Sequence, residues 1–203
     1  MFREWLGRML AERGEFVVVG EADNSRAGLK LIQDLKPDVV ILDLTLRGSS
    51  GLELLKDLKA LGINTAVLVL SMHDEALYAE RALRAGAKGY LSKQAASSAL
   101  FEALDRVLQG KAYLGDGAVS AILGNLTRRA NHKASGVELL ADRELEVFQM
   151  IGRGKKTAEI AEALRLGLST VDTYRARIKE KLGLRNAAEL QTSAAKWLQE
   201  QGL

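Results

Sequence analysis

Apolar residues in the first half of the chain form short blocks separated by helical patterns. The first 13 residues predict a core-facing helix, because apolar side chains recur at helical spacing: Phe2, Trp5, Leu6, Met9 and Leu10. Four apolar runs of strand length follow, namely FVVVG (16–20), DVVILDL (38–44), TAVLVLS (65–71) and GYLS (89–92). Helical patterns lie after the first run and at about 52–61, 74–85 and 95–109. Such alternation predicts an open α/β sheet with parallel, buried strands.

Residues that begin or end helices support these boundaries. Asp23, Asn24 or Ser25 can cap the helix that runs to about Leu35, and Pro37 ends it. Gly62 and Gly86 follow the next two helices, where a left-handed C-cap is expected.

The pattern changes in the second half of the chain. Residues 116–137 mix glycine and small residues with a basic cluster of Arg128, Arg129 and Lys133, which predicts a linker between a domain at 1–115 and a domain at 138–203. From Leu139 onward, apolar residues recur only at helical intervals, over about 142–152, 157–164, 169–183 and 187–199. The second domain is therefore expected to be all-helical.

Residues 157–176 have the order of a helix-turn-helix. Small Ala161 suits a close crossing of the two helices, while Val171, Ile178 and Leu182 give the second helix an inward side. Hydroxyls and cations that can bind phosphate or base edges of double-stranded DNA gather on the opposite side and at the start of the first helix: Lys156, Thr157, Ser169, Thr170, Thr173, Tyr174, Arg177 and Lys181. A solvated amphipathic helix is the alternative, since Asp172 and Glu180 partly offset the cations.

The helical segment resembles the LuxR-type helix-turn-helix along its whole length. The resemblance rests on Arg143, Glu144, Glu146 and Val147, on Gly154, on Ile160-Ala161, on Thr170-Val171 and on Lys181-Leu182-Gly183. It implies that the second helix of the motif enters the major groove. The sequence departs from the family at Gly167-Leu168, where a capping serine is usual, so we expect Gly167 or Ser169 to cap this helix.

Three polar residues end strands of the expected sheet. Asp43 ends the second apolar run, Ser71 ends the third, and Lys93 follows the fourth, so parallel strands bring them to one edge. Together they resemble the flavodoxin-like receiver domain of NarL/FixJ-type response regulators. The resemblance implies that Asp43 accepts a phosphoryl group from a sensor histidine kinase, that Ser71 and Lys93 contact the phosphoryl oxygens, and that Tyr90 moves with them.

One part of the receiver pattern is not in this chain. The family has a first strand, ending in an acidic pair that holds Mg²⁺, before the helix that bears Phe2 and Trp5. Asp43 and the Thr45 carbonyl lack these partners as metal ligands, so phosphorylation should be impaired. Either the receiver is N-terminally truncated, which we favour, or residues 16–20 pair directly with residues 38–44 and a degenerate receiver serves assembly alone.

Two further functions compete with a phosphorylation-controlled DNA-binding regulator. A phosphatase with an aspartate nucleophile wants a carboxylate two residues after Asp43, where this chain has Thr45, so we expect no enzyme. The other is a dimerising module that binds DNA without phosphorylation. Either regulator would present two helical domains to two half-sites, as a homodimer.

Composition removes several other classes. The chain of 203 residues has no cysteine and no apolar run long enough to span a membrane, so we expect a cytoplasmic location. His73 and His132 are too isolated to build a zinc site. The net charge of +3 is too small to indicate a nucleic-acid partner by itself.

Overall fold

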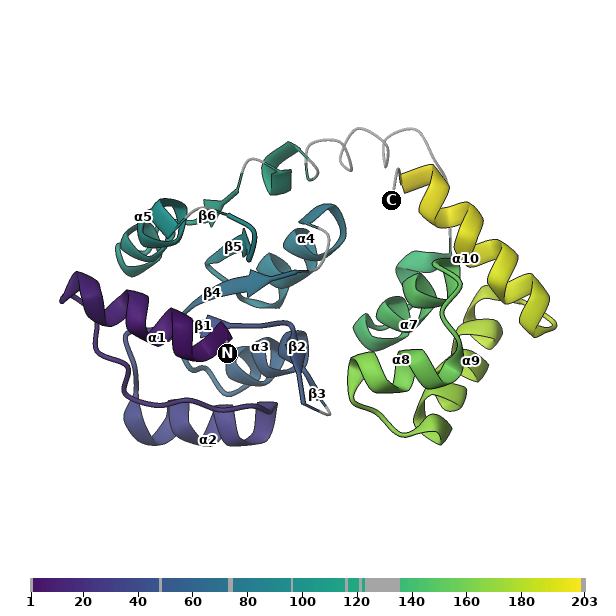
Figure 1. The fold of residues 1–203 in the computed structure, drawn as a ribbon, viewed down its shortest axis with the longest axis horizontal. Coiled ribbons are helices and arrows are strands. Elements are labelled where there is room, and N and C mark those ends of the chain that lie inside the picture. Colours follow the sequence, from purple (N-terminus) through teal and green to yellow (C-terminus); the bar gives the residue numbers. More distant parts are fainter. Residues whose placement is uncertain are drawn as a thin grey trace. The chain divides into compact units, whose positions relative to one another are not determined.

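The chain forms two compact units, Met1–Val119 and Ser120–Leu203 (Figure 1). The computed structural model describes residues 2–47, 49–72, 75–95, 97–115, 117–120, 122 and 136–201. Most of the linker predicted at 116–137 lies outside these residues, as do His73, His132 and the basic cluster at 128–133, so the linker boundaries stay a prediction.

The first unit is an α/β fold, as predicted. Its parallel sheet has the order β1-β4-β5-β6. The strands of this sheet are β1 (Val39–Leu42), β4 (Ala66–Ser71), β5 (Gly89–Ser92) and β6 (Tyr113–Leu114). A hairpin of β2 (Thr45–Leu46) and β3 (Ser49–Ser50) follows β1. The helices are α1 (Phe2–Arg13), α2 (Ser25–Leu35), α3 (Gly51–Ala60), α4 (Glu75–Ala85) and α5 (Ser97–Leu108).

The period-2 alternation of the central strand explains how the sheet is covered. Leu68 and Leu70 of β4 point to one face, where they pack with Leu91 of β5, with the buried side of α5 and with Leu10 of α1. Val67 and Val69 are buried too and belong to the alternate positions of the same strand, and α4 packs against α3 and β5. Burial on both faces is what the uninterrupted apolar run 65–71 predicted.

Helix termini follow the local sequence closely. The Asn24 side chain accepts a hydrogen bond from the Ala27 amide, which confirms one of the three predicted caps of α2. Gly62 and Gly86 have positive φ angles of 67° and 117° just beyond α3 and α4, as expected of left-handed residues after a helix.

The strand predicted at residues 16–20 is wrong. The segment forms no strand and pairs with none of the described residues, and Val17, Val18 and Val19 are 84%, 46% and 55% exposed. Direct pairing with 38–44 is likewise wrong, since within the described part of the sheet β1 is hydrogen-bonded only to β4. An apolar run becomes a strand only beside a partner that completes its ladder, and here Phe16 stacks on Phe101 of α5 while Gly20 lies next to Leu31 and Leu35 of α2.

The helix at the start of the chain is partly different from the prediction. Leu10 is buried and Leu6 and Met9 pack on the same cluster, but Trp5 is about half exposed. The side chain of Phe2 lies outside the described residues. The core therefore takes the second half of α1, where Leu6, Met9 and Leu10 share one side.

Among the short elements that were not predicted are β6 and the β2–β3 hairpin. β6 extends the sheet through Tyr113, which pairs with Gly89, and the hairpin pairs Thr45 with Ser50. Strands of two residues are too short to show a period in the sequence.

The second unit is all-helical, as predicted. It contains the 3₁₀ turn η1 (Val137–Leu139) and the helices α7 (Asp142–Gly152), α8 (Thr157–Leu164), α9 (Leu168–Leu182) and α10 (Ala187–Gln201). α7 packs against α9 and α10, and α8 packs against α9. Buried apolar residues from all four helices make its core, among them Phe148, whose ring centroid lies 5.9 Å from that of Trp197.

Gly152 allows α7 and α10 to approach closely. A Cβ atom at this position would lie 2.6 Å from Leu198 Cδ1 and 2.7 Å from the Ala194 carbonyl oxygen. The backbone of α7 therefore lies directly against α10 at this point.

Gly51 has the same role beneath the sheet edge, and it gives a test of the packing. A Cβ at Gly51 would lie 2.4 Å from the Asp43 carbonyl oxygen and 2.8 Å from Leu44 Cα. We expect Gly51→Ala to lower the free energy of unfolding by about 1–3 kcal/mol, as overpacking does, measured by thermal unfolding of the full chain. Gly7→Ala is the matched control, because nothing lies within 4 Å of its Cβ position. Equal stability of the two variants would contradict this account.

Candidate nucleic-acid interface and phosphoacceptor site

Helix α9 has a buried aliphatic side and an exposed polar side. Val171 and Ile178 are fully buried, and Leu182 is half-buried at the end of the same side. Thr170, Thr173 and Arg177 are exposed. Because these three positions are spaced by three and four residues, they form one stripe along the helix.

The other predicted residues of α9 extend this polar stripe. Tyr174 is half-buried and Ser169 is exposed in the first turn. The Thr173 hydroxyl donates to the Ser169 carbonyl oxygen at 2.8 Å, which fixes its rotamer. Among the described residues Arg177 has no ion-pair partner, so its guanidinium is available to a ligand.

The start of α9 is capped as the sequence allowed. The helix begins at Leu168, with Gly167 as the extended N-cap residue and no side-chain hydrogen bond at the cap. Leu168 is itself exposed, so an apolar side chain stands at the N-terminal end of the polar stripe.

Lys156 and Thr157 lie at the start of α8. Lys156 is exposed at the N-cap position, and Thr157 is the half-buried first residue of the helix. The Lys156 amide donates to Glu159 Oε2 at 2.7 Å, and this hydrogen bond, with the smaller influence of the Lys155 charge, lowers the pKa of Glu159.

Lys181 differs from the rest of the predicted set because its ammonium already has protein partners. Nζ lies 2.6 Å from Glu144 Oε2 and 3.3 Å from the Leu139 carbonyl oxygen. This contact was not predicted, since Glu144 and Lys181 are far apart in the chain and nothing in the local pattern pairs them.

In the α/β unit, Asp43 and Lys93 meet at the carboxyl end of the sheet. Lys93 Nζ lies 2.5 Å from Asp43 Oδ2, and the side chains are 15% and 31% exposed. The other carboxylate oxygen, Oδ1, accepts the Thr45 amide at 3.0 Å. The Lys93 amide donates to the Ser71 carbonyl oxygen at 2.9 Å, so three of the predicted residues lie around one point.

Ser71 and Tyr90 are completely buried behind this pair. Both belong to neighbouring strands, where Ser71 pairs with Ser92 and Tyr90 pairs with Val69. The carboxyl end of the sheet thus carries the partly exposed Asp43 and Lys93, with the buried Ser71 and Tyr90 on the adjoining strands.

The loop beside the hairpin contains a contact that the sequence analysis missed. The Arg47 amide donates to the Asp23 carbonyl oxygen, and Arg47 Nη1 lies 3.6 Å from Asp23 Oδ2. The hydrogen bond from the Asn24 side chain, followed by the Arg47 charge, lowers the pKa of Asp23. The capping box of α3, Ser50 with Glu53, was also missed, although its Ser-x-x-Glu spacing was visible in the sequence.

Comparison with known proteins places both units. The response regulator receiver domain family matches residues 1–105, and the luxR family of bacterial regulatory proteins matches residues 138–194. A transcriptional regulator of Pseudomonas aeruginosa is 40% identical over 90% of this chain and 87% of its own length. The response regulator GacA of Pseudomonas viridiflava is 34% identical over 94% of this chain and 88% of its own.

The chain belongs to the LuxR-type two-component response regulators.

Solved structures of such proteins have the same fold as this response regulator. A LuxR-family two-component response regulator from Aurantimonas sp. SI85-9A1 has a TM-score of 0.59 at 28% identity, covering 62% of this chain and 89% of its own. ChrA, a response regulator of a heme-sensing two-component system, has a TM-score of 0.50 at 28% identity, covering 96% and 91%. The expected family and the expected fold classes of both domains are confirmed.

The family of this response regulator implies a magnesium site, to which Asp43 is the expected contributor. Receiver domains bind Mg²⁺ at an acidic site, and Mg²⁺ is held by carboxylates together with phosphate oxygens and water. The part of the chain that the structure describes contains no cluster of three carboxylates or histidines that could hold a metal. Asp43 offers one carboxylate, and Lys93 occupies one of its oxygens.

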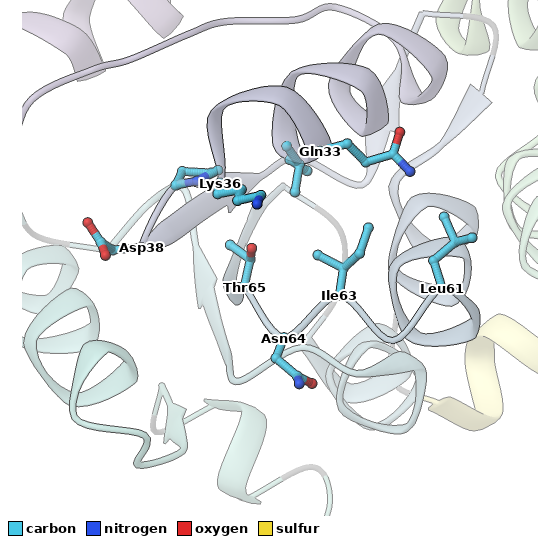
Figure 2. A pocket seen from close by; sticks show the side chains of 9 residues that line it. Gln33, Lys36, Asp38, Leu61, Ile63, Asn64 and Thr65 are labelled. Atoms are coloured by element: carbon cyan, nitrogen blue, oxygen red, sulfur yellow. The ribbon is translucent and has the colours of Figure 1, made fainter.

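A hollow in the α/β unit lies away from Asp43. It has a volume of about 610 Å³ and lies between the end of α2 and the α3–β4 connection, where Lys36, Asp38 and Asn64 are among the lining residues (Figure 2). Asp38 and Thr65 precede β1 and β4, whereas Asp43 follows β1, so the hollow is at the opposite end of the parallel strands.

No helix within the described ranges is both long and apolar enough to cross a membrane.

The lowered pKa of Glu159 predicts how the helical unit responds to acid. A carboxyl group whose folded-state pKa is below its unfolded value of about 4.5 stabilises the fold above that value, and this contribution is lost as the pH falls through the lowered pKa. We expect Glu159→Ala to lower the melting temperature at neutral pH, with the difference from wild type vanishing in acid. Thermal unfolding over a pH series measures this.

Glu162→Ala is the control for this pH series, since Glu162 is an exposed residue of the same helix without the amide contact. A constant difference between wild type and Glu159→Ala at every pH would contradict the role of the carboxylate.

Proposed function

We propose that this response regulator recognises specific double-stranded DNA sequences by placing α9 in the major groove. The single observation that carries the proposal is the exposed stripe of Thr170, Thr173 and Arg177 opposite the buried Val171 and Ile178. The buried side fixes which residues face outward, and the stripe itself carries two hydroxyls and a cation, although Asp172 and Glu180 are also exposed on this helix. A major groove admits one α-helix, so a helix of 15 residues with one free side is a suitable reader.

Each side chain of the stripe has a chemical role that suits DNA. A guanidinium binds a phosphate or, with two hydrogen bonds, the O6 and N7 atoms of guanine. Threonine and tyrosine hydroxyls bind phosphate oxygens or base edges. Lys156 and Thr157 lie at the start of α8, where the exposed Lys156 offers a positive charge to a phosphate, although the Lys156 amide is already used by Glu159.

Helix-turn-helix regulators commonly bind as dimers, with half-sites about one helical turn apart. We extend this arrangement to the present chain, with two copies on one operator.

Arg177 gives the direct test of the interface. We expect Arg177→Ala to weaken binding about tenfold and to reduce the salt dependence of binding by about one counterion, because one cation leaves the DNA surface. The probe is a duplex selected from a random library with the full wild-type chain, and affinities are measured by gel shift at several salt concentrations.

The control for Arg177→Ala is Lys196→Ala, which removes one positive charge from the exposed side of α10. Its affinity and salt dependence should equal those of the wild type. An Arg177→Ala chain that binds as tightly as the wild type would overturn the assignment of α9 as the reader.

For the α/β unit, we propose that Asp43 is the phosphoacceptor position and that a sensor histidine kinase is the partner it serves. The Asp43–Lys93 contact supports this, because lysine can neutralise phosphoryl oxygens. Phosphorylation of this chain should nevertheless be slow, since the described residues form no group of three or more carboxylates or histidines that could hold Mg²⁺. Thr45 stands where a phosphatase would need its general acid, and its hydroxyl is a poor one.

Mass spectrometry can measure this limitation. After incubation of the full chain with acetyl phosphate and Mg²⁺, we expect only a minor phosphorylated fraction, and we expect it to be absent from Asp43→Asn. Asp38→Asn, at the other end of β1, is the control and should behave as the wild type. Complete phosphorylation of the wild type would contradict the inference that this chain holds Mg²⁺ poorly. Phosphorylation of Asp43→Asn would contradict Asp43 as the phosphoacceptor.

DNA affinity with and without acetyl phosphate then separates two modes of regulation. An unchanged affinity supports binding that does not depend on phosphorylation, whereas a large increase supports control through Asp43.

A further inference from the structure

Lys181 ends the polar side of α9, but its ammonium is directed into its own domain. Nζ donates to Glu144 Oε2 at 2.6 Å and to the Leu139 carbonyl oxygen at 3.3 Å. A lysine ammonium has three protons, so two of them are already used. The Glu144 side chain is only 4% exposed, which makes this an ion pair with one buried member.

The Glu144 carboxylate joins two helix ends. Its Oε2 atom accepts the Ala141 amide at 2.7 Å, at the N-terminus of α7, as well as the Lys181 ammonium in the last turn of α9. The end of α9 is thereby bound to the start of α7.

The segment that precedes α7 is bound at the same place. Leu139, whose carbonyl accepts from Lys181, belongs to η1, and a Cβ at Gly136 would lie 3.4 Å from Leu182 Cδ2. Residues 136–141 therefore run against the last turn of α9. At the other end of α9, Gly167 provides no side-chain cap, so the polar contacts that fix the helix are concentrated at its C-terminal end.

Energetics favour keeping Lys181 in this position. A buried carboxylate is costly to leave without its cation, and the Ala141 amide alone would replace only part of the lost interaction. Moving the ammonium to a DNA phosphate would exchange one charged partner for another and leave Glu144 unpaired. Arg177 has no such cost, because none of the described residues forms an ion pair with it.

We propose that Lys181 is a positioning residue, which sets the orientation of α9 through Glu144 and Leu139, and that it is not a DNA contact. This inference rests on the proposed function of α9. It replaces the expectation that Lys181 belongs to the DNA-binding set, and it adds Glu144, a buried anion, to the residues on which DNA affinity depends.

The salt dependence of DNA binding distinguishes the two roles. Lys181→Met should lower the affinity for the selected duplex by about tenfold, or about 1.4 kcal/mol, while the slope of log K against log salt stays at the wild-type value. Loss of a phosphate contact would instead reduce the slope by about 0.9, as we expect for Arg177→Ala. Measurements are made well below the melting temperature, with folding checked by circular dichroism.

Glu144→Gln supplies the sharper comparison. If Lys181 acts through Glu144, neutralising the carboxylate should weaken DNA binding as much as Lys181→Met does, and the double variant should be no weaker than either single one. If Lys181 binds phosphate, Glu144→Gln frees the ammonium and removes an anion, so affinity should stay the same or rise. Lys181→Arg, which can donate to both partners, should restore most of the affinity.

Three outcomes overturn the proposal. A reduced salt slope in Lys181→Met assigns the residue to the DNA surface. Unchanged affinity in a folded Lys181→Met or Glu144→Gln chain would show that the contact has no effect on DNA binding. A wild-type chain that selects no duplex at all defeats the proposed function itself, and the stability coupling between Glu144 and Lys181 in the same variants would still report whether the ion pair exists.

Discussion

Burial of the aliphatic side of α9 is the constraint on which the recognition surface depends. Val171 and Ile178 are two turns apart and both lie in the core of the helical unit. With those two positions fixed, rotation of the helix about its axis is no longer free, and Thr170, Thr173 and Arg177 must face outward. Hydrophobic packing therefore determines which side chains form the polar stripe. The ion pair between Lys181 and Glu144 then helps to fix the direction of the helix axis.

In the α/β unit the corresponding constraint is the parallel arrangement of the strands. Because β1, β4 and β5 run in the same direction, the residues that follow them meet at one edge, although Asp43 and Lys93 are distant in sequence. Their contact needs no motif in the ordinary sense. The contact requires only that β1 ends just before Asp43 and β5 just before Lys93. Gly51 contributes because, having no Cβ, it lets α3 begin directly against the Asp43 backbone.

The comparison of sequence and structure shows which forces are local. Helices α7 to α10 were predicted within one or two residues, since apolar period and flanking glycines are properties of the segment itself. The run at 16–20 misled because a strand is a property of two segments, and Val17 has no neighbour to complete its ladder among the described residues. The partners of Lys181 were missed for the same reason, as a carboxylate in α7 and a carbonyl in η1 leave no mark near residue 181.

The close approach of Gly152 to α10 has a consequence for the permitted geometry of the helical unit. A side chain at position 152 would collide with the Ala194 carbonyl, so this place in α7 requires glycine for the two helices to keep their present approach. A longer α9–α10 connection could be tolerated as a wider loop, but an inserted residue inside α10 before Ala194 would misalign the joint. The close approach at Gly152 therefore fixes where α10 lies against α7.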